Sequence, residues 1–147
     1  MPILKAILDT SVRVSVAFAK EGLAKELRNL ITEETFTLVT SKEIMAELYR
    51  VLHYPRIRKQ FHPSEEDIDE FIGLILEKAL LTPGAYSLHR IKDDPTDDMF
   101  LACAVEGKAD YIISRDPHLR NLKQFQGIKI IGVKGFVEKV RKKKQER

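Results

Sequence analysis

The sequence predicts a three-layer α/β/α sandwich around a central, mostly parallel sheet of four to five strands. Two observations predict this fold class. Short apolar runs alternate along the chain with amphipathic stretches of helical spacing, and aspartates follow two of these runs directly. Strands that alternate with helices pair in parallel, because each helix crosses back over the sheet before the next strand begins. We expect the 147 residues to form one domain, with a basic C-terminal helix and tail over about 134–147.

The composition is that of a soluble globular protein, with 44% hydrophobic and 32% charged residues. No run reaches about 18 apolar residues, so we expect no membrane span. The N-terminus lacks a basic region ahead of an apolar core and therefore does not resemble a signal peptide. The single cysteine, Cys103, excludes an internal disulfide, which suits a cytoplasmic protein. A net charge of +3 is too small to indicate nucleic-acid binding.

The first half of the chain contains several clear elements and one ambiguous stretch. Residues 3–8 form a short apolar run, which predicts a strand. Residues 12–18 alternate like a strand but precede a clear helix, so their structure stays open. The basic run 56–59 is interpreted as a solvated loop. The other predicted elements are a helix over 21–33, a strand over 35–39, a helix that Ser41 caps and that ends before Pro55, and a helix that starts at Ser64.

The second half predicts a helix over 97–106 that Gly107 closes, and then a strand over 110–114. A short helical turn over 117–122, a last strand over 128–131 and a terminal helix over 134–144 follow.

Two aspartates, Asp9 and Asp116, follow predicted strands directly. Ligands of open parallel sheets bind in the crevice outside the carboxyl ends of the strands, so both side chains are candidates for a binding site. The alternative is that each one caps the turn that follows it, as aspartate often does. The sequence leaves both interpretations open.

Glu47 shares a helix face with the apolar residues Ile44 and Val51. A carboxylate on a face that packs inward needs a partner, because an unpaired buried charge is very costly. That partner is either a cation of a functional site or a nearby arginine such as Arg50. Glu47 could also lie at the edge of the apolar stripe.

Four aspartates lie within six residues: Asp93, Asp94, Asp97 and Asp98. One of the last two is expected to cap the helix over 97–106, but a cap does not account for four acids. Two carboxylates about 4 Å apart repel by roughly 4 kcal/mol at an effective dielectric constant near 20. A cation among their oxygens would relieve this repulsion, and an all-oxygen site selects Mg²⁺ or Mn²⁺.

Other chemistries lack their residues. The four histidines share no zinc spacing, Cys103 has no activating base nearby, and no glycine-rich phosphate loop is present.

With Asp9, Glu47, Asp97 and Asp116 in this order, the chain resembles the PIN-domain nucleases, particularly the toxin-type subfamily of prokaryotic toxin–antitoxin pairs. The matching pieces are LDTSV (8–12), SKEIMAELYRVL (41–52), DPTDDMFLACAVEGKADYIISRD (94–116) and IKIIGVKGF (128–136). They are spread over nearly the whole chain. Each piece is degenerate, but their order and spacing together are specific.

The resemblance implies an endoribonuclease that cleaves single-stranded RNA with one or two Mg²⁺ or Mn²⁺ ions. Asp9 and Asp116 would be direct ligands, and Glu47 and Asp97 would ligate through water or hold a second ion. Asp98 stands where the family's loop often has asparagine, so it is a substitute ligand. Ser114 has the hydroxyl position of the family and would support the ligands. Ser11 replaces the usual asparagine of the Asp-Thr-Asn opening.

The resemblance also implies partners: an RNA substrate, an antitoxin protein and a second copy of the chain, which would pair through the helices over 21–33 and 64–80. Two alternatives remain, a non-catalytic PIN-like module that binds RNA or acts as a scaffold, and a Mg²⁺-binding α/β regulatory domain. Residues expected to contact RNA are Arg13, Arg50, Arg56, Arg58, Lys59 and Arg115, with Tyr54 and Phe61 available for stacking.

Overall fold

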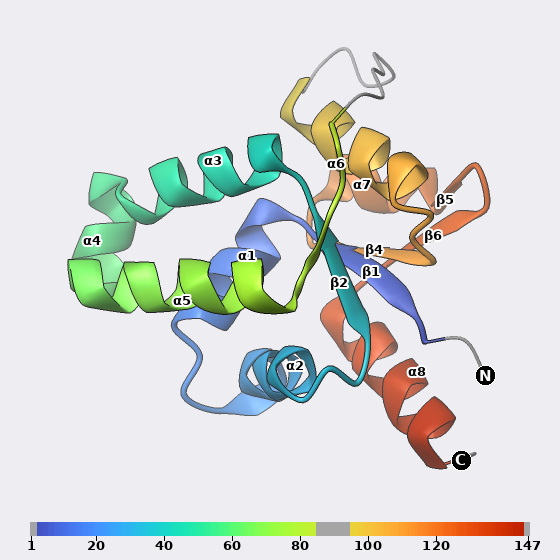
Figure 1. The fold of residues 1–147 in the computed structure, drawn as a ribbon, viewed down its shortest axis with the longest axis horizontal. Helices are drawn as coiled ribbons and strands as arrows, with labels where there is room; N and C mark the ends of the chain where they lie inside the picture. The colour runs from blue at the N-terminus through green and yellow to red at the C-terminus, as the bar shows by residue number, and fades with distance from the viewer. Residues whose placement is uncertain (1–2, 85–94, 146–147) are drawn as a thin grey trace.

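A computed structural model describes residues 3–84 and 95–145, with the side chains of 95–98 and 144–145 left out. Within these residues the sheet has six strands in the order β3-β2-β1-β4-β6-β5 (Figure 1). All neighbours pair in parallel except β5 and β6, which are antiparallel. The strands are β1 (Lys5–Leu8), β2 (Thr37–Thr40), β3 (Leu80–Leu81), β4 (Tyr111–Ile113), β5 (Gln124–Phe125) and β6 (Ile128–Ile131).

The predicted fold class is therefore confirmed, but the expected number of strands was too low. The two additional strands, β3 and β5, have only two residues each and lie at the two edges of the sheet. Two residues are too few to show an alternating pattern, so sequence periodicity could not reveal them.

Helices cover both faces of the sheet, as the positions of the labelled helices in Figure 1 show. Ala6, Leu8 and Leu38 point into a core shared with helices of one layer, whereas Ile7 and Val39 point into a second core on the other face. Helices α1, α2, α3, α4, α5 and α8 contribute to the first core, and α6, α7 and the first turn of α3 contribute to the second. The helices are α1 (Thr10–Ala17), α2 (Gly22–Thr32), α3 (Lys42–Leu52), α4 (Pro55–Phe61), α5 (Glu65–Lys78), α6 (Pro95–Glu106), α7 (Pro117–Leu122) and α8 (Val133–Gln145).

The starts of α3 and α5 follow the capping residues in the sequence. The Ser41 hydroxyl accepts a hydrogen bond from the Ile44 backbone N–H at 3.2 Å. Ser64 and Asp67 exchange side-chain and backbone hydrogen bonds in a capping box. Both predicted helix starts are confirmed.

The structure resolves the ambiguous stretch 12–18 as helix α1 up to Ala17. Val12, Val14 and Val16 are all buried because α1 packs beside both α2 and α3. This enclosure on several sides explains why buried valines alternate on a helix.

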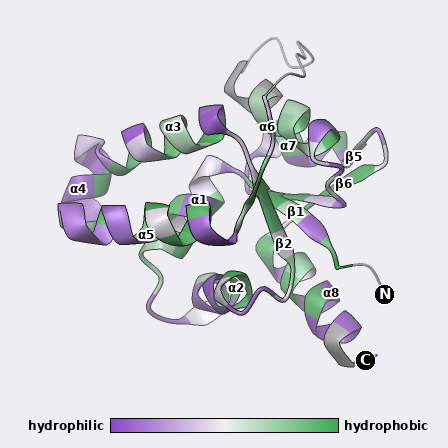
Figure 2. Ribbon diagram, viewed as in Figure 1, coloured by the Kyte–Doolittle hydropathy of each residue, from purple (hydrophilic) through white to green (hydrophobic). Residues whose placement is uncertain are grey.

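The interpretation of the basic run 56–59 as a loop was wrong, because these residues form part of α4. Pro55 occupies the first position of the helix, where its fixed φ is favourable and its missing N–H has no effect. Ile57 anchors the helix in the core with 4% of its surface exposed. Figure 2 shows that the rest of α4 is predominantly hydrophilic, which gave the run its loop-like composition.

Helix α6 begins at Pro95, two residues before the predicted start. Asp97 and Asp98 therefore lie in its first turn, and the interpretation of either one as the N-cap was wrong. Gly107 ends this helix where space is short, since an added Cβ would lie 2.5 Å from Val39 Cγ1. Asp93 and Asp94 lie outside the described residues.

Candidate functional site

The candidate site lies at the carboxyl ends of two adjacent strands, β1 and β4. These strands pair in parallel, with Leu8 opposite Ile113. The Asp9 backbone N–H continues this pairing and donates to the Ile113 carbonyl oxygen at 3.0 Å. The chain leaves β1 toward β2 on one side, whereas β4 lies on the other side. Such a switch in strand order creates a crevice in which α/β proteins bind ligands.

The Asp9 carboxylate is buried, with 4% of the residue exposed, and both of its oxygens accept hydrogen bonds. Oδ1 accepts from Ser11 Oγ at 3.1 Å and from the Val12 backbone N–H at 2.9 Å. Oδ2 accepts from Ser114 Oγ in a short hydrogen bond and from the Arg115 backbone N–H at 3.3 Å. All four donors are neutral groups that fix the orientation of a buried negative charge.

Ser114 connects Asp9 to Asp116. Its side chain is fully buried, and its hydroxyl accepts the Asp116 backbone N–H at 2.9 Å while it donates to Asp9. Asp116 Oδ1 accepts from the His118 backbone N–H at 2.9 Å and caps α7, as Asp9 caps α1. Capping is thus part of the role of both acids, and it uses Oδ1 of each.

Glu47 on α3 lies near the same carboxyl ends of the strands. Its Oε2 accepts a hydrogen bond at 2.9 Å from the hydroxyl of Thr10, the residue next to Asp9. Glu47 is half-buried rather than enclosed in the core. Thr10 therefore couples Glu47 to Asp9, a role that sequence reasoning missed although Thr10 belongs to the LDTSV piece.

Asp97 and Asp98 are placed by the backbone of α6. Met99, the next residue, belongs to the buried core cluster that also contains Ile7 of β1 and Ile44 in the first turn of α3. The beginning of α6 thus packs beside the beginning of α3. The side chains of Asp97 and Asp98 lie outside the described part of the chain.

Arg13 is fully buried, so its predicted role as an RNA contact was wrong. Its Nε donates to the Leu8 carbonyl oxygen at 2.7 Å, and its Nη2 donates to the Val39 carbonyl oxygen at 3.4 Å. Burial lowers the Arg13 pKa to about 10, which leaves the side chain charged at neutral pH, while nearby Asp9 and Glu47 favour its charged form. No local pattern in the sequence marks this burial, because it depends on the packing of α1 against α3.

Cys103 is buried on α6. Burial raises the pKa of its thiol, which disfavours the reactive thiolate.

Three other arginines that were expected to contact RNA differ in their surroundings. Arg56 and Arg115 line a cavity of about 540 Å³, together with Tyr54, Thr10 and Ser11. Arg58 instead forms an ion pair with Glu65 on α5, at 3.3 Å.

In a comparison with protein families, the model of the PIN domain matches residues 5–118. The chain belongs to the PIN-domain family. The match covers more than half of the chain and includes the two strands and three acids described above. A search of curated proteins finds no match to this chain. PIN domains are generally metal-dependent nucleases, so the family indicates nuclease-type chemistry and a nucleic-acid partner.

The carboxylates of this PIN domain fit a hard cation in kind, since Asp9, Glu47 and Asp116 offer only oxygen ligands. Oδ2 of Asp116 accepts no hydrogen bond from the described residues. Among the side chains that the structure describes, however, no three Asp, Glu, His or Cys residues lie close enough to hold a metal ion. The described acids would therefore need a further ligand.

No helix in the described part of the PIN domain is long and apolar enough to cross a membrane.

Proposed function

We propose that this PIN domain is a Mg²⁺- or Mn²⁺-dependent endoribonuclease that cleaves single-stranded RNA. The observation that supports the proposal is the Ser114 hydroxyl, which ties Asp9 at the end of β1 to Asp116 after β4. Two acids far apart in sequence are thereby fixed at one edge of the sheet. Asp9 and Asp116 are the proposed direct metal ligands.

Glu47 and Asp97 complete the proposed ligand set, either through water or around a second ion. The backbone of α6 carries Asp97 and, at the next position, the proposed substitute ligand Asp98 in its first turn. When bound, the dication lowers the pKa of a water molecule and stabilises the negative charge that develops on the phosphate.

The protein's own groups hold the acids in position. Ser114 and the backbone N–H groups of Val12 and Arg115 orient the Asp9 carboxylate, and Thr10 orients Glu47. The buried guanidinium of Arg13 offsets part of the negative charge of Asp9 and Glu47. Hydrogen bonds that orient metal ligands typically affect metal affinity or activity by about 10–100-fold.

The decisive experiment incubates the full chain with labelled single-stranded RNA and Mn²⁺, with and without EDTA. Asp9→Asn should abolish cleavage, whereas Asp69→Asn should leave it unchanged, because Asp69 is an exposed acid on α5. RNA binding without metal-dependent cleavage would instead support a non-catalytic module.

We further propose that the protein is cytoplasmic, forms a homodimer and acts as the toxin of a toxin–antitoxin pair. Sedimentation of the purified chain tests the dimer. Growth arrest on expression, relieved by co-expression of the neighbouring gene, tests the toxin role; expression without any growth defect would contradict it.

A further inference from the structure

A cavity of about 540 Å³ lies between α1 and α4, next to the acids. Thr10 and Ser11 form its inner wall, and these residues bond Glu47 and Asp9, respectively. Arg115, which precedes Asp116, lines it as well. The cavity is therefore continuous with the edge of the sheet where the candidate ligands lie.

The outer wall of the cavity carries groups that suit a nucleotide. Tyr54, the N-cap residue of α4, has 41% of its surface exposed. Arg56 and Gln60 are exposed and lie four residues apart on the same face of α4. Aromatic rings and guanidinium groups stack on unpaired bases, and an amide can bond a base edge or a 2′-hydroxyl.

The two arginines of the cavity differ in how they are held. Arg115 Nη1 donates to Ser15 Oγ at 2.7 Å, which fixes its guanidinium along the wall formed by α1. Arg56 forms no ion pair with any described residue, so its charge is available to a phosphate. Cations on both sides of the opening would attract a phosphodiester backbone.

We propose that this cavity binds one unpaired nucleotide next to the cleaved phosphate of the RNA. The inference rests on the proposed nuclease function and adds the feature that selects single-stranded substrate. The volume lies within the range of about 300–1,000 Å³ that is typical of small-molecule sites. A base can stack on the Tyr54 ring at the cavity wall only when it has left its own stack and pair, so the nucleotide must be unpaired.

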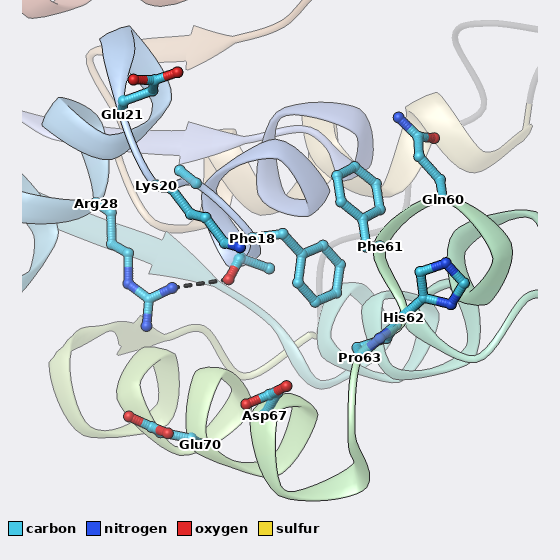
Figure 3. A pocket seen from close by; sticks show the side chains of 12 residues that line it. Phe18, Lys20, Glu21, Arg28, Gln60, Phe61, His62, Pro63, Asp67 and Glu70 are labelled. Carbon is cyan, nitrogen blue, oxygen red and sulfur yellow. Dashed lines mark hydrogen bonds between the residues drawn. The ribbon is translucent and has the colours of Figure 1, made fainter.

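A neighbouring cavity of about 700 Å³ is not proposed to bind the RNA (Figure 3). Phe61 lines both cavities and stacks on Phe18, with ring centroids 4.7 Å apart. Arg28 is engaged there, since its Nη1 donates to the Ala17 carbonyl oxygen at 2.8 Å. Asp67 and Glu70 also line this second cavity and would repel a phosphate.

The test compares two cavity variants with two matched controls. Tyr54→Ala and Arg56→Gln change the cavity. Tyr49→Ala and Lys139→Gln are the controls, because Tyr49 is similarly exposed, at 48%, Lys139 is an exposed cation on α8, and neither residue lines the cavity. Thermal unfolding first establishes that all four variants are folded.

Cleavage of a labelled single-stranded oligoribonucleotide is then measured with Mn²⁺, using intact RNA and RNA with an abasic site on either side of the cleaved bond. Tyr54→Ala should lower kcat/KM on the order of tenfold, the usual effect of losing one base–aromatic stack. An abasic site on one side should lower wild-type activity similarly but should cause no further loss in Tyr54→Ala. Arg56→Gln should weaken activity and reduce its dependence on salt.

The outcomes separate this inference from the proposed function. If wild type cleaves and all four variants cleave equally well, the cavity is not a nucleotide site, although the nuclease function stands. The inference also fails if the cavity variants change only the oligomeric state, since the cavity is then a contact between copies. If wild type binds RNA through Tyr54 without cleaving it, the nucleotide site stands and the nuclease function fails. If it neither cleaves nor binds RNA, both fail.

Discussion

Ser114 Oγ donates a short hydrogen bond to Asp9 Oδ2 across 105 positions of sequence, and the same oxygen accepts the Asp116 backbone N–H. One buried hydroxyl thus connects two acids that follow different strands.

Ser114→Ala should destabilise the protein by about 1–3 kcal/mol, because the buried Asp9 carboxylate loses a donor. Cleavage should fall by about 10–100-fold, since the carboxylate is then less well oriented. Urea denaturation and RNA cleavage measure the two effects. Thr32→Ala is the control, because Thr32 is exposed on α2 and, among the described residues, its hydroxyl donates to the Arg28 carbonyl oxygen of the same helix. Equal activity of both variants would contradict the role of Ser114.

Metal binding should be visible without any reaction. At about a hundred times its dissociation constant, Mn²⁺ should stabilise the folded protein by about 2.7 kcal/mol, which corresponds to a rise in Tm of roughly 5–10 °C. Asp116→Asn should remove most of this rise, because the proposed site loses a ligand, and Asp69→Asn should retain it. Differential scanning fluorimetry with and without EDTA makes the measurement. A Tm that does not respond to Mn²⁺ or Mg²⁺ would argue against the site.

His53 should make stability depend on pH. Its Nδ1 lies 2.7 Å from the Tyr49 carbonyl oxygen and its Nε2 lies 2.9 Å from Glu65 Oε2, so both nitrogens face acceptors and the imidazolium suits the site. The hydrogen bond to Glu65 is the main cause that raises the His53 pKa. Protonated His53 therefore contributes to the free energy of unfolding. This contribution is fully present below the unfolded pKa of about 6.5 and is lost as pH rises through the raised pKa of the folded state.

The loss of stability in His53→Ala should therefore be larger at pH 5.5 than at pH 8.5, as measured by urea midpoints. His62→Asn serves as the control, since His62 adopts a positive φ of 49° that asparagine tolerates. A loss that is the same at both pH values would show that the imidazolium is not what holds α3 to α5.

Arg13→Ala should destabilise the protein by about 3–5 kcal/mol, because it leaves a cavity and removes donors from the Leu8 and Val39 carbonyl groups. Arg13→Met fills more of the same space and should cost less than Arg13→Ala. Chemical denaturation of both variants checks the order. If Arg13→Ala were as stable as wild type, the guanidinium would not hold the ends of β1 and β2 together.

The sequence predicted the parts of the fold that depend on local patterns. Ser41 and Ser64 gave the starts of α3 and α5, because a cap is decided within three or four residues. Helix α4 was missed, since its stability comes from Ile57 in the core and its other residues are polar. The two-residue strands exist only through pairing with distant neighbours.

The candidate site shows the same division. Strand ends drew attention to Asp9 and Asp116, and the resemblance to PIN domains implied that β1 lies beside β4. The Thr10–Glu47 hydrogen bond and the burial of Arg13 could not, because each requires the packing of α1 against α3. Arginine is rarely buried, so its charge indicated the surface.

The buried guanidinium of Arg13 has a further consequence. With a pKa of about 10, it is a resident counter-ion that neither dialysis nor a chelating agent can remove. The negative charges of Asp9 and Glu47 are therefore balanced in part by Arg13, and not by an exchangeable dication alone. Removal of the metal should therefore abolish RNA cleavage while the chain stays folded. Adding the metal back should restore cleavage without a refolding step.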